Sequence, residues 1–289
     1  MAVHADDESE AGAIGIVAGG GDLVKEIIHE LRSSGKEIAV AAIDGEADAS
    51  LNGDNVGHFN WGEIGRILRF FKDRNCRRLV LAGRITARPD FRSIIGDPGT
   101  LLRLPKIIAA VAGGDDALLK RVIGLIEAEG FRVIGVSEVA PNLLAREGCL
   151  GGAKRDPSLN DDIAFAKTVL RDLGRHDIGQ AVVVEKGRIV AVEAAEGTDG
   201  MLQRVGALRE AGRLSKKRGG ILVKASKPEQ DHRVDLPVIG PDTVKNAAEA
   251  GLTGIVVEAD RVLVVSRATM IDAANRAGVF VVAEDGFQS

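Results

Sequence analysis

Short runs of consecutive apolar residues alternate along the chain with longer segments in which apolar residues recur every three or four positions. The runs at residues 13–18, 37–43 and 78–82 predict buried strands, and the segments at 23–34 and 64–71 predict helices. Continuous apolar strands separated by helices are typical of a parallel sheet that is covered on both faces. The first half of the chain is therefore predicted to form an α/β domain with a mostly parallel sheet.

The second half has a different pattern, because two of its strands are joined by a tight turn. A helix at residues 161–173 is followed by strands at 180–184 and 188–192, which predict a hairpin. The other expected elements here are strands at 219–224, 254–258 and 279–282 and helices at 201–212, 241–250 and 268–277. A hairpin beside further strands and helices predicts a second, smaller α/β domain with a mixed sheet.

Breaker residues suggest where the chain divides. Residues 148–158 (GCLGGAKRDPS) lack periodicity and are predicted to be an interdomain linker. Residues 1–12 are acidic and polar and are expected to be a disordered leader. The first domain is therefore expected to span residues 13–147, including helices at 101–112 and 115–128, and the second to span 159–289.

Composition narrows the class of protein. With 38 basic and 42 acidic residues the chain carries a net charge of −4, and only 3% of its residues are aromatic. No strongly basic nucleic-acid surface and no base-stacking platform are therefore expected. Two cysteines and the absence of a signal peptide suggest the cytoplasm, and no apolar run approaches the roughly 20 residues of a membrane span.

A glycine-rich turn lies between the first strand and the first helix. Gly19, Gly20 and Gly21 would let a phosphate approach the backbone, and the helix that follows offers free N–H groups. The motif departs from the dinucleotide fingerprint because Val24 occupies the third glycine position, although Asp44 could accept a ribose hydroxyl. The turn predicts a Rossmann-like first domain, and a plain tight turn remains the alternative to a nucleotide contact.

Two segments of the second half concentrate charge directly after strands. Residues 193–200 (EAAEGTDG) place carboxylates and a hydroxyl on a turn, and residues 224–235 (KASKPEQDHRVD) combine cations, an amide and acids. Cations for oxyanions beside carboxylates for a hard metal favour phosphoryl chemistry. Arg84, which also follows a strand, suits phosphate oxygens, with a surface salt bridge as its alternative.

Other chemistries find no motif in the chain. The five histidines are scattered, the two cysteines form no C-x-x-C pair, and neither a Walker A nor a G-x-S-x-G motif is present. Any metal is therefore expected to be Mg²⁺-like and held by carboxylates. The acidic pair at residues 115–116 is explained as a helix cap, with metal binding as the alternative.

The ordered set of segments resembles one protein family. The segments are GIVAGGG at 15–21, GDDALL at 114–119, DIGQAVVV at 177–184, EAAEGTD at 193–199 and LVKASKPEQD at 222–231. Together they resemble the LpxI-type UDP-2,3-diacylglucosamine pyrophosphatases of lipid A synthesis. The resemblance extends over residues 13–282, and its departures are small: Val24 stands where proline is expected, and Arg84 where lysine is also common.

The resemblance implies a specific reaction. Family members use Mg²⁺ and water to hydrolyse UDP-2,3-diacylglucosamine to 2,3-diacylglucosamine 1-phosphate (lipid X) and UMP, with attack at the β-phosphorus. It also implies two α/β domains, a homodimer, and a peripheral position on the cytoplasmic face of the inner membrane.

The resemblance also assigns roles to residues of this chain. Asp231 is expected to be the essential carboxylate, as a metal ligand or as the group that orients water. Asp199 and Glu196 would assist the metal, and Lys224 would join Asp231 and Asp199 as a catalytic residue. The residues expected to bind substrate are Gly19, Gly20, Gly21, Arg84, Gln180, Thr198, Lys227, Gln230 and Arg233.

Other functions remain open from the residues alone. A Rossmann-type NAD(P) oxidoreductase built on the glycine turn and Asp44 is one alternative, and a non-catalytic nucleotide-sensing module is another. Residues 61–74 combine apolar and basic positions, which is typical either of a helix packed on a sheet or of one lying on a membrane surface.

Overall fold

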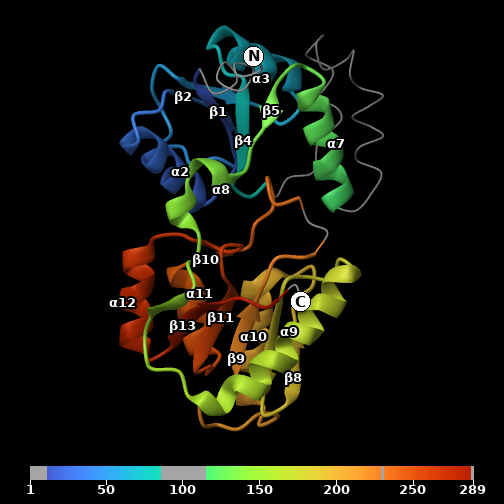
Figure 1. Cartoon of the computed structure of the whole chain (residues 1–289), viewed down its shortest axis with the longest axis vertical. Helices are drawn as coiled ribbons and strands as arrows, with labels where there is room; N and C mark the ends of the chain where they lie inside the picture. Colours follow the sequence, from blue (N-terminus) through green and yellow to red (C-terminus); the bar gives the residue numbers. More distant parts are fainter. Residues whose placement is uncertain (1–11, 86–114, 229–230, 288–289) are drawn as a thin grey trace, which may run out of the picture. The chain divides into compact units, whose positions relative to one another are not determined.

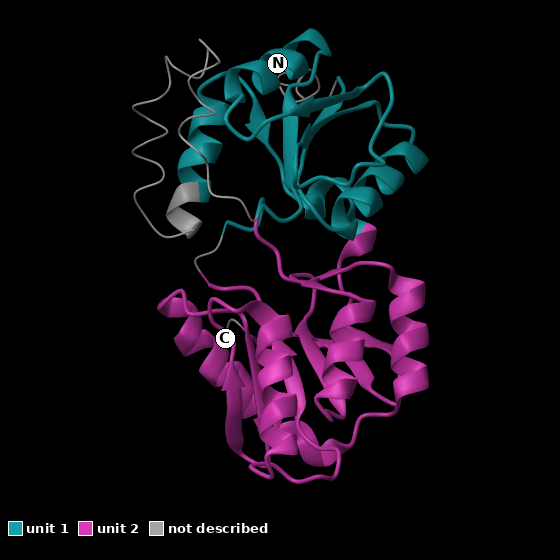
Figure 2. Ribbon diagram, turned by 180° about the vertical axis from the view of Figure 1, so that it is seen from behind, with its two compact units in different colours: residues 1–141, 231–234 teal, residues 142–230, 235–289 magenta. Residues whose placement is uncertain are grey.

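The structure is a computed structural model, and it describes residues 12–85, 115–228 and 231–287. The chain divides into two compact units, drawn in different colours in Figure 2. Unit 1 comprises Met1–Pro141 and Asp231–Val234, and unit 2 comprises Asn142–Gln230 and Asp235–Ser289. The chain therefore leaves unit 2 for four residues near its last quarter, contributes them to unit 1, and returns.

Unit 1 is built on a parallel sheet in the order β3-β2-β1-β4-β5 (Figure 1). The strands are β1 Ile14–Ala18, β2 Ile38–Ile43, β3 Val56–Phe59, β4 Arg78–Ala82 and β5 Arg132–Val133. Every described pairing among them is parallel, and β1 at the centre pairs with both β2 and β4. This strand order is that of a Rossmann half-domain, so the predicted Rossmann-like fold is confirmed.

Helices with one apolar face cover this sheet. They are α2 Asp22–Ser33, α3 Ile64–Asp73, α7 Asp115–Glu127 and the short α8 Val136–Val139. In α2 the buried residues Val24, Ile27, Ile28 and Leu31 recur at helical spacing and face the core. The helix predicted at 101–112 lies outside the described residues.

The amphipathic helix α3 packs on the core of unit 1. Its residues Ile67, Leu68 and Phe71 are buried, and Phe70 packs edge-on against Phe59 with 5.3 Å between ring centroids. The guanidinium of Arg74 stacks 3.9 Å from the centroid of Phe70. Core packing therefore accounts for the apolar positions of this helix, as the first of the two interpretations expects.

Unit 2 has a mixed six-stranded sheet in the order β6-β13-β11-β9-β7-β8. Its strands are β6 Gly148–Gly151, β7 Ala181–Glu185, β8 Arg188–Val192, β9 Ile221–Lys224, β11 Gly254–Glu258 and β13 Phe280–Glu284. β9, β11 and β13 run parallel, whereas β6 and the β7–β8 hairpin run antiparallel to their neighbours. The mixed sheet is confirmed, and the two units are nearly equal in length, with 145 residues in unit 1 and 144 in unit 2.

Four helices are described beside the sheet of unit 2 (Figure 1). They are α9 Asn160–Arg175, α10 Gly197–Glu210, α11 Pro241–Glu249 and α12 Arg267–Ala277, with 3-10 turns at Pro141–Leu143 and Pro157–Leu159. A two-stranded parallel sheet pairs β10 Val238–Ile239 with β12 Leu263–Val264. None of the described helices of the chain is long and apolar enough to cross a membrane.

The segment predicted to be a linker is partly a strand. Gly148–Gly151 form β6, which pairs antiparallel with β13, and the contacts divide the chain before this segment, at Pro141 and Asn142. A four-residue strand with two glycines has no alternation of its own, and its conformation comes from the β13 edge that it pairs with. The linker prediction was therefore wrong for these residues.

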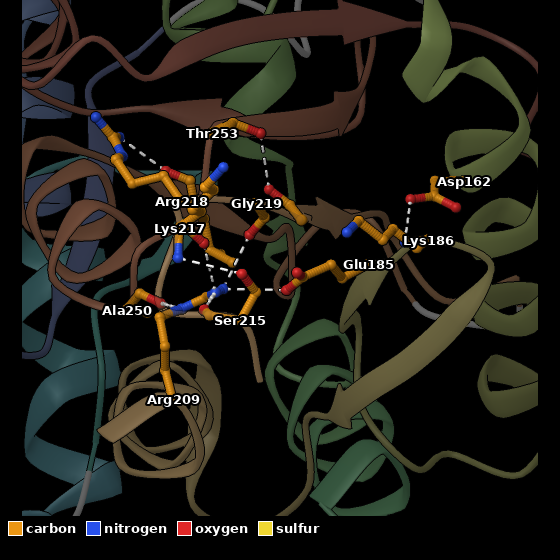
Figure 3. A network of polar contacts seen from close by, with 12 residues as sticks. Asp162, Glu185, Lys186, Arg209, Ser215, Lys217, Arg218, Gly219, Ala250 and Thr253 are labelled. Carbon is orange, nitrogen blue, oxygen red and sulfur yellow. Dashed lines mark hydrogen bonds and ion pairs between the residues drawn. The ribbon is translucent and has the colours of Figure 1, made fainter. Parts of the chain in front are cut away.

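A buried arginine forms hydrogen bonds at the edge of the unit 2 sheet where β9 begins (Figure 3). Arg209, 9% exposed, donates to the carbonyls of Ala250, Lys217 and Gly219 at 3.0 Å each and to the carboxylate of Glu185 at 3.1 Å. These bonds join the end of α10 to Glu185 at the end of β7 and to the loop that precedes β9. They hold the entry to β9, and so the start of the strand that ends at Lys224.

The two cysteines have opposite environments. Cys76 is 3% exposed, and burial raises the pKa of its thiol to about 11, whereas Cys149 is exposed on β6. Only thiolates react readily with electrophiles.

In the folded protein at pH 8 we expect a maleimide or Ellman's reagent to modify Cys149 within minutes and Cys76 far more slowly. After denaturation we expect both cysteines to react. Equal modification rates in the native protein would contradict the packing described here, and peptide mass spectrometry separates the two sites.

Candidate active site

The glycine turn of unit 1 is joined to the loop after β4 by backbone contacts. Gly20 and Arg84 exchange two N–H···O bonds of 2.8 Å, and the Gly19 N–H donates to the carbonyl of Ala82 at 2.8 Å. A Cβ on Gly19 would lie 2.6 Å from the Arg84 carbonyl oxygen. The structure therefore brings Gly19, Gly20 and Arg84 together, and glycine is required here by the close packing of two loops.

The third glycine has a different role. Gly21 precedes α2 with φ of 100°, a conformation that favours glycine, and a Cβ there would meet nothing within 4 Å. The carboxyl ends of parallel strands are where ligands of such sheets bind. Gly21 therefore leaves open space at that edge, whereas Val24, at the position of the missing glycine, is buried in the core.

Asp44, the acid expected to contact a ribose in a dinucleotide site, lies beside His58. Asp44 follows β2, and its carboxylate lies 3.5 Å from the ring of His58. Both side chains are about half exposed. The arrangement offers no specific support for the dinucleotide interpretation.

Asp231 and Arg233 form a closed pair within unit 1. The Arg233 side chain donates to Asp231 through Nε at 3.0 Å and Nη2 at 2.8 Å, and the Arg233 backbone N–H donates to the same carboxylate at 3.1 Å. Nη1 of Arg233 also bonds Glu127 of α7 at 2.9 Å. The hydrogen bonds from Arg233 lower the pKa of Asp231, so this carboxylate is charged at neutral pH.

The same segment lies at the carboxyl edge of the unit 1 sheet. Gly135 follows β5, and a Cβ on it would stand 3.3 Å from the Cα of Arg233 and 3.5 Å from the His232 carbonyl oxygen. Val234 packs against the hydrophobic core of unit 1. A segment distant in sequence thus adds a charged pair to the sheet edge that carries the glycine turn.

In unit 2, strand direction gathers polar residues at one edge. Lys224 ends β9, and because β7 runs antiparallel to β9, Ala181 lies opposite Lys224. Gln180 before β7 and Glu193 after β8 therefore reach this same edge. Of these, Gln180 and Lys224 were predicted site residues, whereas Glu193 was not singled out.

Lys224, Thr198 and Glu193 are linked by hydrogen bonds. Nζ of Lys224 donates to the Thr198 hydroxyl at 2.9 Å, and that hydroxyl donates to Glu193 at 2.7 Å. Lys224 is 6% exposed and Glu193 5% exposed. Burial lowers the pKa of the Lys224 ammonium and outweighs the opposing effect of the nearby charges of Glu193, Asp199 and Asp235. Asp235 is thus a second neighbour of this lysine that the sequence prediction missed.

The other predicted residues of unit 2 have separate partners. Asp199 accepts from Nδ2 of Asn246 at 2.8 Å, Glu196 pairs with Arg204 at 2.7 Å, and Lys227 bonds Asp177. Thr198 and Asp199 lie in the first turn of α10, which begins earlier than predicted. Gln230 lies outside the described residues.

Gln180 presents a free acceptor. Its backbone N–H donates to Glu193 at 3.1 Å, while its side-chain Oε1 is buried without a hydrogen-bond partner among the described residues. A buried acceptor without a donor is costly. Such an atom is suited to accept from a ligand.

No metal cage is preformed in the part of the chain that the structure describes. Within it, no group of three or more His, Cys, Asp or Glu side chains is arranged to hold an ion. Magnesium, however, is usually bound by one or two carboxylates together with substrate phosphates and water. The carboxylate of Asp199, exposed and bonded to Asn246 through one oxygen, fits that pattern.

Comparison with known proteins identifies the family. The model of the LpxI N-terminal domain matches residues 13–143, and that of the LpxI C-terminal domain matches residues 146–282. The chain belongs to the LpxI family. It is 43% identical over 273 residues to the UDP-2,3-diacylglucosamine pyrophosphatase LpxI of Caulobacter vibrioides, covering 94% of this chain and 97% of that protein. The resemblance seen in the sequence is thereby confirmed.

A solved structure adds less. The UDP-glucose 4-epimerase of Thermus thermophilus in complex with NAD is 13% identical, covers 94% of this chain and 85% of its own, and has a TM-score of 0.27. That score is too low for any argument about this chain.

The boundary between the two LpxI domain matches falls between residues 143 and 146. This is close to the division of the structure at Pro141 and Asn142.

The loop packing at Gly19 predicts an asymmetry between two glycines. Gly19→Ala should lower the free energy of unfolding by about 1–3 kcal/mol, because its Cβ would overlap the Arg84 carbonyl. Gly124→Ala, at an exposed position of α7 with open space, should raise it by about 0.5–1 kcal/mol. Urea unfolding followed by circular dichroism measures both, and equal effects of the two substitutions would contradict the close approach.

Proposed function

We propose that this protein hydrolyses the pyrophosphate bond of UDP-2,3-diacylglucosamine in lipid A synthesis. The products are UMP and 2,3-diacylglucosamine 1-phosphate, with water attacking the β-phosphorus. The observation that carries the proposal is the 43% identity to the Caulobacter vibrioides pyrophosphatase along 94% of the chain. The charged groups at the two sheet edges support it, because hydrolysis of a pyrophosphate depends on fixed charges placed near developing negative charge.

Lys224 is suited to a phosphate oxygen. Its ammonium is buried, and its one hydrogen bond among the described residues goes to Thr198, which leaves N–H donors over. A buried cation with unused donors interacts strongly with an anion, because little water competes. We assign Lys224 to the pyrophosphate oxygens, with Lys227 and the exposed Arg84 as further substrate contacts.

Asp231 is better suited to orient water or bind a metal than to accept a proton. A general base works best when its pKa lies near the operating pH, and the bonds from Arg233 hold the pKa of Asp231 below its usual range. The carboxylate remains charged and fixed in direction by the two-point contact with Arg233. Arg233 keeps donors beyond those that hold Asp231 and Glu127, so it stays a proposed substrate contact.

Mg²⁺ fits the proposal as a companion of the substrate. Asp231, Asp199 and Glu196 are the proposed carboxylates, and Glu196 would first have to leave Arg204. The ion, when bound, would neutralise charge on the pyrophosphate oxygens. Since no three-residue cage exists among the described residues, we expect the free protein to bind Mg²⁺ weakly and the pyrophosphate to complete the site.

The nature of the substrate extends the proposal. Its acyl chains favour a membrane location, and we propose that the protein binds peripherally at the cytoplasmic face of the inner membrane. A homodimer remains part of the proposal on the strength of the family resemblance.

Hydrolysis in ¹⁸O-labelled water tests the reaction and its direction of attack. With Mg²⁺ present, mass spectrometry should find the label in 2,3-diacylglucosamine 1-phosphate and none in UMP, because the new P–O bond forms at the β-phosphorus. Excess EDTA should stop turnover. Label in UMP would move the attack to the α-phosphorus, and an absence of products would overturn the activity.

Asp231→Asn tests the carboxylate itself. The change preserves size while removing charge, and we expect kcat/KM to fall by at least about 10³-fold. The matched control is Glu127→Gln, which removes the other carboxylate bonded to Arg233 while leaving the Asp231 contact in place. Comparable losses in the two variants would show that Arg233 pairing, and not Asp231, matters.

A further inference from the structure

We infer that Glu193 is a positioning residue for the reaction: it holds the hydroxyl of Thr198, which in turn holds the ammonium of Lys224. The inference rests on the proposed function, because it assigns Lys224 to the pyrophosphate. It also gives Thr198 a role other than the direct substrate contact expected from the sequence.

The chemistry of the three groups fixes which of them donates and which accepts in each hydrogen bond. An ammonium only donates and an ionised carboxylate only accepts, whereas a hydroxyl does both. Lys224 must therefore donate to the Thr198 oxygen, at 2.9 Å, and the single Thr198 proton must go to Glu193, at 2.7 Å. Without an acceptor at Glu193, the hydroxyl would be free to rotate, and its lone pairs would no longer be directed at Lys224.

Glu193 is held firmly enough to serve as the anchor. Its second carboxylate oxygen accepts from the backbone N–H of Gln180 at 3.1 Å, and its own backbone N–H donates to the carbonyl of Ala181 at 2.9 Å. The residue is 5% exposed, so little water competes for these bonds. The carboxylate is thus tied to the start of β7 and the end of β8, which are strands of the same sheet as Lys224.

A second buried glutamate at the same edge provides a comparison, because its partners do not include Lys224. Glu258 ends β11, is 4% exposed, and accepts from the backbone N–H of Ser226 at 2.8 Å and from its hydroxyl at 2.7 Å. Like Glu193, it is a buried glutamate at the carboxyl edge that accepts from a backbone N–H and a hydroxyl. The difference is that the hydroxyl bonded to Glu193 also carries the Lys224 ammonium.

A double-mutant cycle on the full-length chain tests the inference, with UDP-2,3-diacylglucosamine and Mg²⁺ as the assay. Glu193→Gln leaves one acceptor oxygen for two donors, the Gln180 N–H and the Thr198 hydroxyl, and should lower kcat by about 10- to 100-fold in the wild-type background. In the Lys224→Met background the same change should have no further effect, because the group that Glu193 positions is gone. Thr198→Ser should retain activity through its hydroxyl, whereas Thr198→Val should lose as much as Glu193→Gln.

Glu258→Gln is the matched control. It removes an equally buried carboxylate from the same edge, and its effect on kcat should be the same in the wild-type and Lys224→Met backgrounds. Melting temperatures of all variants separate misfolding from lost positioning. Glu193→Gln and Lys224→Met effects that multiply, or full activity of Thr198→Val, would overturn the inference while wild-type activity stands. An inactive wild-type protein would overturn the proposed function first, and the inference with it.

Discussion

The arrangement of polar groups at the carboxyl edge of the unit 2 sheet depends on the buried positive charge of Lys224. Removing an ammonium from water costs several kcal/mol unless hydrogen bonds and opposite charge compensate. At Lys224, compensation comes from the Thr198 hydroxyl and from the carboxylates of Glu193, Asp199 and Asp235. These groups come from a helix start, a strand end and a loop, so the position of one charge constrains how several elements meet.

The mixed sheet is what makes this possible. In an all-parallel sheet, residues before one strand and after the next lie at opposite edges. Because β7 is antiparallel to β9 and β8 is antiparallel to β7, the residue before β7 and the residue after β8 both reach the carboxyl edge, beside Lys224. Unit 1 also gathers charged groups at the carboxyl edge of its sheet, but by another route. Its sheet is parallel, and residues 231–234, which come from a distant part of the sequence, supply the charged pair of Asp231 and Arg233. In both units the charges are fixed by neighbours, which suits electrostatic stabilisation better than proton transfer.

The sequence predicts those parts of the fold that local pattern determines. The apolar runs of β1, β2 and β4 and the helical spacing of α2 identify buried elements directly. The glycine-containing β6 and the half-exposed β3 are not predicted by the sequence pattern, because their conformation depends on the strand edge that each pairs with. The pairing of Lys224 with Thr198 also lay beyond the pattern, since 26 residues separate them and only the strand directions bring them together.

The acidic segment at residues 193–199 shows what residue type alone leaves undecided. Judged by residue type alone, its acids form one group of carboxylates suited to a metal. The backbone, however, places them in different environments. Glu193 directly follows β8 and is 5% exposed, while the chain then turns into α10, which leaves Glu196 and Asp199 exposed with other partners. Glu193, on the sheet side, is buried among its hydrogen-bond partners, whereas Glu196 and Asp199, on the helix side, are exposed to solvent. The boundary between strand and helix, and not the number of acids, therefore separates the buried Glu193 from Glu196 and Asp199, the two exposed acids that we propose for Mg²⁺.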